Sequence, residues 1–337
     1  MKLGTDPEIA FVTKNGHVVP AGKVLLASGY DLIDPPPPNE GQEQTKGHKL
    51  VLNEDCLLYE DGMSDEFNIS PSGSPKVLIN RVKSLLQLSL DIAKKQGLGI
   101  EILPTIPVTK NDIESGGVVC ARFGCDPDES IYNDGFDPAR VDAKLEMNRF
   151  FGCHIHASAT KNMRANGGCL WIIDNIYYVM SAFDLVLGLA DVIYDHSDQA
   201  KNRRKVYGRA GRHRIQLPYG LEYRTPGNSV LRVPSVLENM FSLAKYAMVL
   251  AEQPHLIDDL LNQVPSEELF DIITGVDFPN AKEVYAEVVI PALEHISFHE
   301  ELQDVKGEIY LPINYVAEKP KGVYSEPDFI SNWGLNE

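Results

Sequence analysis

The stretch GCHIHASAT, residues 152–160, places two histidines one residue apart in a segment that predicts a β-strand. Side chains two residues apart in a strand point to the same face of the sheet, so His154 and His156 form a pair. Such a pair has two interpretations, a binding site or the solvated face of an antiparallel sheet. Partners with the same spacing elsewhere in the chain would favour the binding site.

Three further stretches have polar or charged residues at this spacing. They are Asp6 and Glu8 in GTDPEIAF, Glu66 and Asn68 in DEFNIS, and Glu222 and Arg224 in YGLEYRTPGN. Any one pair alone is typical of a solvated strand. Together they would line one concave sheet face with carboxylates and imidazoles. The carboxylates repel one another unless cations bind. The pattern therefore predicts a divalent metal, and the oxygen-rich set favours Mg²⁺ or Mn²⁺ over zinc.

A basic cluster, KNRRKVYGRAGRHR at residues 201–214, precedes the LEYR stretch. Its arginines and glycines suit phosphate binding, but a basic surface patch beside an acidic one has the same composition. The cluster runs through IQLPYG directly into LEYR, so its arginines can reach the same site as Glu222. Metal-binding carboxylates beside such arginines are what phosphoryl transfer from a nucleotide requires. Neither a GxxxxGK[ST] loop nor a GxGxxG fingerprint occurs in the sequence.

Composition excludes several classes of function. A net charge of −17 over 337 residues argues against nucleic-acid binding and against docking on anionic lipid. Five cysteines without a CxxC pair favour a reduced, cytoplasmic setting, and the N-terminal residues have no apolar region typical of a signal peptide. The apolar stretch at residues 170–194 contains three aspartates, which predicts a core helix rather than a membrane span.

Strand and helix signals interleave irregularly along the chain. Short strands and turns fill the N-terminal third, and later strands are expected at 101–108, 150–158 and 219–225. Ser74, Pro75 and Gly97 bound one predicted helix, and others are expected at about 140–148, 166–195, 235–263 and 281–302. The lack of regular βαβ alternation predicts an α+β fold with a mostly antiparallel sheet. The proline-rich segment at about 31–49 predicts an exposed, mobile loop, either a lid or a surface excursion.

The stretches GTDPEIAF, EDGMSDEFNI, GCHIHAS and YGRAGRHRIQLPYGLEYRTPGN, between about residues 4 and 230, resemble the phage-associated carboxylate–amine ligases, or type 2 amidoligases. That family is distantly related to glutamine synthetase and γ-glutamylcysteine synthetase. The resemblance implies one catalytic domain over residues 1–337, with a glutamine-synthetase-like curved sheet and helices on its outer face. It also implies a reaction in which ATP activates a carboxylate as an acyl phosphate, which an amine then attacks.

The resemblance also implies a role for individual residues. Metal binding falls to Glu8, Glu66, His154, Glu222 and, in YEDG, Glu60 or Asp61, of which we take Asp61. His156 is implied to lie towards ATP, and Arg209 and Arg212 to contact phosphate. Glu222 and Arg224 form the catalytic pair, with Arg224 on phosphate or the acyl-phosphate transition state. Asp126, Asp128 and Glu129, in GCDPDE, either bind the amine or cap a turn.

We therefore expect an ATP- and Mg²⁺-dependent (or Mn²⁺-dependent) ligase whose substrates are a small-molecule or peptide carboxylate and an amine. Two alternatives stay open. One is a metal-dependent hydrolase with an HxH motif, although that class usually has the motif near the N-terminus and does not need the arginines. The other is a non-catalytic binding protein with the same fold. The sequence does not choose the substrates or the oligomeric state.

Overall fold

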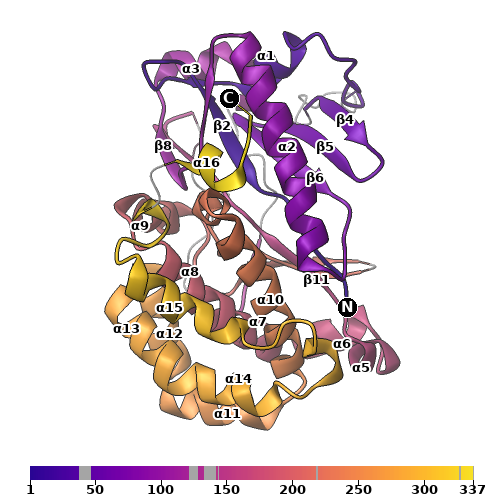
Figure 1. Cartoon of the computed structure of the whole chain (residues 1–337), viewed down its shortest axis with the longest axis vertical. Helices are drawn as coiled ribbons and strands as arrows, with labels where there is room; N and C mark the ends of the chain where they lie inside the picture. Colours follow the sequence, from indigo (N-terminus) through magenta and orange to yellow (C-terminus); the bar gives the residue numbers. More distant parts are fainter. Residues whose placement is uncertain are drawn as a thin grey trace.

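The computed structural model describes residues 1–37, 47–120, 128–132, 142, 144–217, 219–325 and 328–336. Two larger antiparallel sheets, a two-stranded ribbon and a set of helices form the described part of the molecule (Figure 1). The strands are β1 Leu3–Thr5, β2 Glu8–Val12, β3 Val18–Val19, β4 Lys49–Asn53, β5 Cys56–Asp61, β6 Ser64–Ile69, β7 Gly99–Glu101, β8 Thr105–Pro107, β9 Glu129–Ser130, β10 Asn148–Phe150, β11 Ile155–Ser158, β12 Arg212–Gln216 and β13 Gly220–Tyr223.

The α-helices are α1 Ala21–Leu26, α2 Pro75–Lys95, α3 Lys110–Ser115, α4 Gly117–Cys120, α5 Lys161–Ala165, α6 Cys169–Asp174, α7 Ile176–Phe183, α8 Leu189–Tyr194, α9 Asp198–Val206, α10 Pro234–Ala251, α11 Pro254–Gln263, α12 Ser266–Gly275, α13 Phe278–Val284, α14 Ile290–Ile296, α15 Leu311–Glu318 and α16 Phe329–Trp333. Two π-helical turns, η2 Asp184–Gly188 and η4 Tyr285–Val289, interrupt longer helices. Short 3₁₀ turns are η3 Asn228–Arg232, η5 Glu300–Leu302, η6 Glu308–Tyr310 and η7 Gly322–Ser325.

One sheet has the strand order β1-β11-β13-β12-β9 and the other the order β3-β2-β6-β5-β4, with β7 also paired to β2. Every pairing between these strands is antiparallel, as the irregular order of strand and helix signals predicts. A separate ribbon pairs β8 with β10. The fold is therefore a mixed helical and antiparallel one, in agreement with the α+β prediction.

The two sheets meet where β1 ends and β2 begins. Thr5 pairs with Ile155 in the first sheet, and Glu8 pairs with Glu66 in the second. Pro7 lies between them and has no N–H to extend a ladder, so the chain changes sheets there. The N–H of Glu8 donates to the carbonyl of Gly152, at 3.0 Å, which ties the second sheet to the segment before β11.

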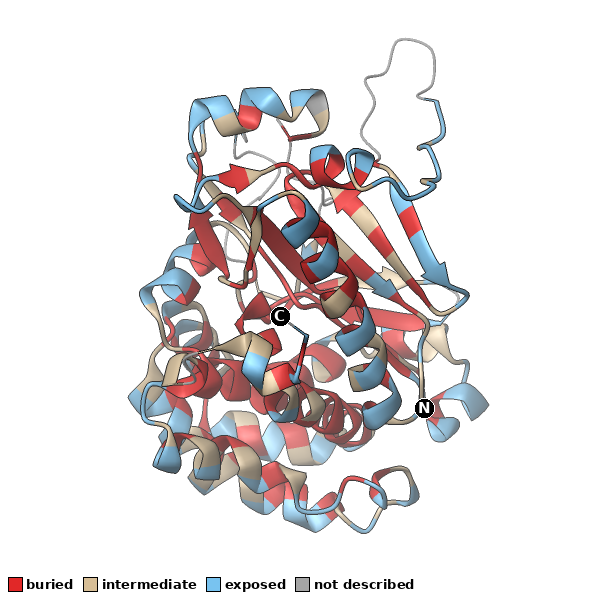
Figure 2. Cartoon of the chain, turned by 45° about the horizontal axis from the view of Figure 1, so that its top comes forward, coloured by how far each residue is buried: buried red, intermediate tan, exposed pale blue. Residues whose placement is uncertain are grey.

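Helices pack against one face of each sheet (Figures 1 and 2). On α2, the Ser89 hydroxyl donates to Asp65 of β6 at 2.6 Å, and the Tyr223 hydroxyl of β13 donates to Asp184 of η2 at 2.6 Å. Neighbouring residues of a strand face opposite ways. Glu66 and Glu222, each next in sequence to one of these residues, therefore point to the face away from the helices.

The apolar stretch at 170–194 contains the helical run Ile176–Tyr194. Among the described residues this run alone is long and apolar enough to cross a membrane, and 83% of its apolar window is buried inside the protein. Its buried aspartates have partners, because Asp184 accepts from tyrosines and Asp191 pairs with Arg204. These contacts are those of a core helix.

Several predicted elements have different bounds in the structure. Helix α2 follows the prediction, with Ser74 at its N-cap position and Pro75 at its first residue. The prediction of a helix at about 140–148 is wrong over residues 144–148, because Asn148 instead begins β10 and pairs with Pro107. Long-range pairing with β8 overrides the local helical pattern there.

The proline-rich segment at 31–49 is joined at its ends. Ile33 and Lys49 exchange two backbone hydrogen bonds of 2.8 and 3.0 Å. Residues 38–46 lie outside the described residues, so its mobility and its action as a lid stay predictions.

Candidate active site

Three carboxylates of the second sheet converge on the face away from α2. Glu8, Asp61 and Glu66 each offer an oxygen within 4.8 Å of the others. Glu8 and Glu66 are directly opposite in the β2–β6 pairing, and Asp61 ends β5. Glu60 points the other way, and its carboxylate contacts the backbone N–H and Nδ1 of His48, at 3.0 and 2.7 Å. The alternation of β5 thus brings Asp61, and not Glu60, into the group.

The crowding of these acids shifts their titration. Burial raises the pKa of Glu8 to about 8, and the charges of Asp61 and Asp6 add to the effect. The N–H of Gly152, which donates to Glu8 at 2.5 Å, lowers the pKa only in part. Burial and the neighbouring charges of Asp6 and Asp61 likewise raise the pKa of Glu66 well above its ordinary value. A cation would relieve this repulsion.

A second group belongs to the first sheet and the junction between the sheets. Asp6, His156 and Glu222 also offer ligand atoms within 4.8 Å of one another. His156 is directly opposite Glu222 in the β11–β13 pairing. His154 adjoins the group, with Nδ1 3.1 Å from Asp6 Oδ1 and 3.4 Å from Glu222 Oε1. Both histidines of GCHIHASAT therefore face Asp6, as their spacing predicts.

Asp6 is a residue that sequence reasoning paired with Glu8 but did not assign to a role. Burial by itself would raise its pKa, but His154 and His156 outweigh burial and hold the pKa below its ordinary range. Burial lowers the pKa of His154 to about 3. In His156 burial acts in the same direction, but the charge of Asp6 outweighs it and raises the pKa. Burial and Asp6 raise the pKa of Glu222 to about 7.

Several ligand atoms of the second group are buried, and their close contacts are to one another. Within the described part of the chain they are Asp6 Oδ1, His154 Nδ1 and His156 Nε2. Buried polar atoms are normally hydrogen-bonded, and here the two imidazoles lie 3.1 and 3.2 Å from the Asp6 carboxylate. Carboxylate oxygens with one or two imidazoles fit a divalent cation of the Mg²⁺ or Mn²⁺ kind.

Arg224 joins this group to a second set of charges. Its side chain is 1% exposed and donates to Glu222 Oε1 and to the hydroxyl of Tyr207. Its Nε lies 3.6 Å from Asp128 Oδ2, and Asp128 Oδ1 accepts from Arg212 at 3.2 Å. The sequence alone does not single out Tyr207, and it leaves the role of Asp128 open. Both are far from Arg224 in the sequence, so no local pattern predicts that they contact it.

The arginines of the basic cluster at residues 201–214 have different partners in the structure. Arg203 and Arg204 are both buried. Arg203 donates to the carbonyl of Thr225 at 2.6 Å, and Arg204 pairs with Asp191. Arg209 donates to the carbonyls of residues 204 and 205, at 3.2 and 3.1 Å, near the end of α9, where cations are favoured. Arg214, directly opposite Glu222 in the β12–β13 pairing, lies 3.4 Å from its carboxylate.

Of the remaining predicted residues, Glu129 lies on β9, 3.7 Å from His213, and Asp126 is outside the described residues.

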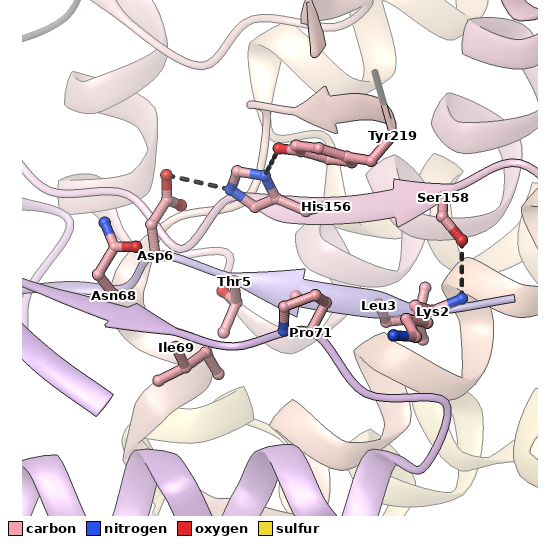
Figure 3. A pocket seen from close by; sticks show the side chains of 11 residues that line it. Lys2, Leu3, Thr5, Asp6, Asn68, Ile69, Pro71, His156, Ser158 and Tyr219 are labelled. Atoms are coloured by element: carbon pink, nitrogen blue, oxygen red, sulfur yellow. Dashed lines mark hydrogen bonds and ion pairs between the residues drawn. The ribbon is translucent and has the colours of Figure 1, made fainter. Parts of the chain in front are cut away.

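A pocket of about 320 Å³ opens beside the second group (Figure 3). Asp6 and His156 form one end of it, and Tyr219 Oη lies 2.7 Å from His156 Nδ1. The remaining wall is partly apolar and is formed by Lys2, Leu3, Gly4, Thr5, Asn68, Ile69, Pro71 and Ser158. These residues come from separate segments of the chain, so sequence spacing identified only His156, Asp6 and Asn68 among them.

Comparison with known proteins identifies a family. The model of the phage phiEco32-like COOH.NH2 ligase-type 2 family matches residues 152–335, more than half of the chain. The match extends past residue 230, where the motifs recognised in the sequence end, as far as residue 335, and it does not include the N-terminal motifs. No curated protein matches the chain.

One solved structure, described as apo GmaS without ligand, has 12% identity and a TM-score of 0.38, and the alignment covers 90% of this chain and 72% of that one. So distant a likeness supports no conclusion about fold or function. The family match does, and the chain belongs to the phage phiEco32-like carboxylate–amine ligases of type 2.

Proposed function

We propose that this protein is an ATP- and Mg²⁺-dependent ligase that forms an amide bond through an acyl phosphate. One observation carries the proposal: two groups of candidate metal ligands lie at the junction of the sheets, and Arg224 contacts the second group through Glu222. Family membership supports the reaction class, a carboxylate joined to an amine. A substrate that is a small molecule or a peptide end is compatible with both.

The two groups of candidate ligands are proposed to bind one divalent cation each. Glu8, Asp61 and Glu66 would hold one divalent cation. Asp6, Glu222 and His154 would hold a second, since His154 Nδ1 lies within 3.4 Å of both carboxylates. Divalent cations, when bound, neutralise charge on phosphate oxygens and hold them for transfer. Mn²⁺ would serve in the same ligand sets.

His156 and the pocket beside it are proposed to take the nucleoside part of ATP. Leu3, Ile69 and Pro71 supply apolar surface, and Ser158 supplies a hydroxyl. Because His156 lines this pocket and also faces Asp6, a nucleotide seated there would direct its phosphates towards the metal ligands. This arrangement supports the role of His156 that the family resemblance implies.

The arginines are proposed to stabilise the transferred phosphoryl group. Glu222, Tyr207 and Asp128 orient Arg224 from three directions, which makes its planar fork a fixed donor. Arg212 shares Asp128 with it. Arg209 is proposed as a further phosphate contact on the resemblance alone.

The reaction has two proposed steps. First, a carboxylate oxygen of the substrate attacks the γ-phosphorus of ATP, and ADP leaves. Next, the amine nitrogen attacks the carbonyl carbon of the acyl phosphate, phosphate leaves, and the nitrogen loses a proton. The buried setting of Glu222 and Arg224, each 1% exposed, limits access of water to the acyl phosphate, which water would hydrolyse.

The test is nucleotide turnover with a pooled set of amino acids and polyamines. The protein, ATP and Mg²⁺ should yield ADP in a pool-dependent manner, and Glu222→Gln should abolish it. Glu268→Gln, on an exposed surface of α12, is the matched control and should turn over normally. AMP as the product would overturn the acyl-phosphate mechanism. Failure of the protein to bind ATP with Mg²⁺ would overturn the ligase proposal itself.

A further inference from the structure

Tyr207 lies between two residues of the site that adjoin different strands of the first sheet. Its hydroxyl oxygen accepts a hydrogen bond from Nη2 of Arg224. The same oxygen lies 3.3 Å from Nε2 of His154. His154 directly precedes β11 and Arg224 directly follows β13, so this one hydroxyl links the metal-binding side of the site to the arginine side.

The position of Tyr207 is well determined by its neighbours. Its ring lies 5.0 Å from the Arg203 guanidinium and 5.3 Å from that of Arg224. Its N–H donates to the carbonyl of Arg203 at 2.7 Å. Gly208 follows with φ +70°, and a Cβ there would come within 1.9 Å of Arg203 Nη1. The turn after α9 is thus packed tightly enough to hold the phenol in one place.

The hydroxyl oxygen of Tyr207 can accept hydrogen bonds from both His154 and Arg224. His154 Nδ1 is buried and lies 3.1 Å from Asp6 Oδ1 and 3.4 Å from Glu222 Oε1, the two carboxylates that would share a cation with it. A neutral imidazole that binds a cation through Nδ1 must have its proton on Nε2. Nε2 then needs an acceptor, and Tyr207 Oη is at hydrogen-bond distance. A hydroxyl oxygen has two lone pairs, enough for His154 and Arg224 together.

We propose that Tyr207 is a positioning residue, whose hydroxyl oxygen holds His154 as the Nε2-protonated tautomer and at the same time orients Arg224. The inference rests on the proposed function, because it takes His154 Nδ1 as a metal ligand. Acceptors behind a metal-binding imidazole fix both its tautomer and its ring orientation. Tyr207 therefore couples the binding of the cation to the placement of Arg224.

The first experiment measures Mn²⁺ binding from the electron paramagnetic resonance signal of free Mn²⁺. Tyr207→Phe keeps the ring and removes only the hydroxyl, so it should weaken Mn²⁺ binding by about tenfold or more. Tyr177→Phe is the matched control, because the Tyr177 hydroxyl contacts Ser266 in the helical region, at 3.0 Å, and should leave binding unchanged. Glu222→Gln should weaken binding more severely.

The second experiment reads the tautomer directly in the unaltered protein. In ¹⁵N-histidine spectra of the Mg²⁺-saturated protein, the signal absent from His154→Ala should report a proton on Nε2. In Tyr207→Phe at the same Mg²⁺ concentration, which no longer saturates the weakened site, this signal should shift towards a mixture of tautomers. A proton on Nδ1 in the unaltered protein would overturn the inference even if the variant did not fold.

The outcomes separate this inference from the proposed function. If Mn²⁺ binds, depends on Glu222, and is unaffected in Tyr207→Phe, the inference is overturned and the proposed metal site stands. If the unaltered protein binds no Mn²⁺, or Glu222→Gln binds it equally well, the proposed site itself is overturned and the inference with it. If Tyr207→Phe binds Mn²⁺ more weakly and Tyr177→Phe binds it normally, the inference is supported.

Discussion

Arg224 has contacts in three directions that a different cation could not reproduce. Its guanidinium donates to Glu222 and Tyr207 and lies beside Asp128. Lysine has a single ammonium group and cannot span three partners with fixed geometry. The side chain is therefore more than a source of positive charge in this site.

We predict that Arg224→Lys lowers kcat about 100-fold, as the loss of one preorganised donor does in other sites. The charge stays, so Mn²⁺ binding should change by only a few fold. Steady-state kinetics and a Mn²⁺ titration on the same sample check both parts. An equal loss of Mn²⁺ binding would mean that Arg224 supports the metal ligands rather than the phosphoryl group.

Asp128 is a second residue whose importance lies in its partners. Its carboxylate is 2% exposed and lies between Arg212 and Arg224. We predict that Asp128→Asn lowers the free energy of unfolding by roughly 1–4 kcal/mol, because two buried guanidinium groups lose an anionic neighbour. Urea denaturation measures the change. Asp142→Asn, on an exposed residue, is the control, and an equal effect of the two changes would contradict the prediction.

At the scale of elements, the π-helical turn η2 connects the helices to the first sheet. Asp184 accepts hydrogen bonds from Tyr223 of β13, from the N–H of Gly211 and from Tyr132, at 2.6, 3.0 and 2.9 Å. Gly211 and Tyr223 directly precede Arg212 and Arg224, both near the site. A π turn within a helix re-aims its side chains, and here it directs an acid at three donors.

Burial raises the pKa of Asp184 to about 6, although these donors lower it in part. The folded protein therefore keeps this proton up to about pH 6, whereas the unfolded chain loses it near the ordinary value of 3.8. Between these values the folded state binds more protons, so its stability falls as pH rises.

We predict that the stability difference between the unaltered protein and Asp184→Asn is largest at pH 4, decreases towards pH 6 and is constant above it. Other titrating groups are common to both proteins and cancel in the difference. At pH 4 the variant should be less stable by about 1–3 kcal/mol, because an amide has one acceptor oxygen instead of two. Urea titrations at a series of pH values would show this, and a difference independent of pH would contradict it.

At the scale of the molecule, the site lies where the two sheets join. Glu8, Asp61 and Glu66 belong to one sheet, and His156 and Glu222 to the other, with Asp6 in the connection. A single large cluster of buried apolar side chains includes residues of both sheets and of the helices. Cations bound to both groups would stabilise the junction directly.

Calorimetry should therefore show one unfolding transition for the whole chain, shifted upwards by Mg²⁺. At a concentration 100 times the dissociation constant, binding adds about 2.7 kcal/mol, or several degrees in Tm. Glu66→Gln should reduce the shift. Two transitions, of which Mg²⁺ moves only one, would contradict the prediction that residues 1–337 form a single catalytic domain.

Local patterns of the sequence determined which residues share a face and where α2 lies. His154 and His156 meet Asp6 together because a strand has a period of two, and Ser74 and Pro75 mark the start of α2 because helix ends have specific requirements. The same periodicity correctly places Glu66 and Glu222 on polar faces. These properties depend on neighbours within a few residues.

Only the tertiary structure decided which faces meet and which charges pair. The spacing of Asp6 and Glu8 put them together, yet Pro7 carries the chain from one sheet to the other and sends them to different ligand groups. The choice of Asp61 over Glu60, the pairing of Asp128 with two arginines and the place of Tyr207 behind His154 all depend on contacts between distant segments. Such contacts follow from the packing of whole elements, which no local pattern contains.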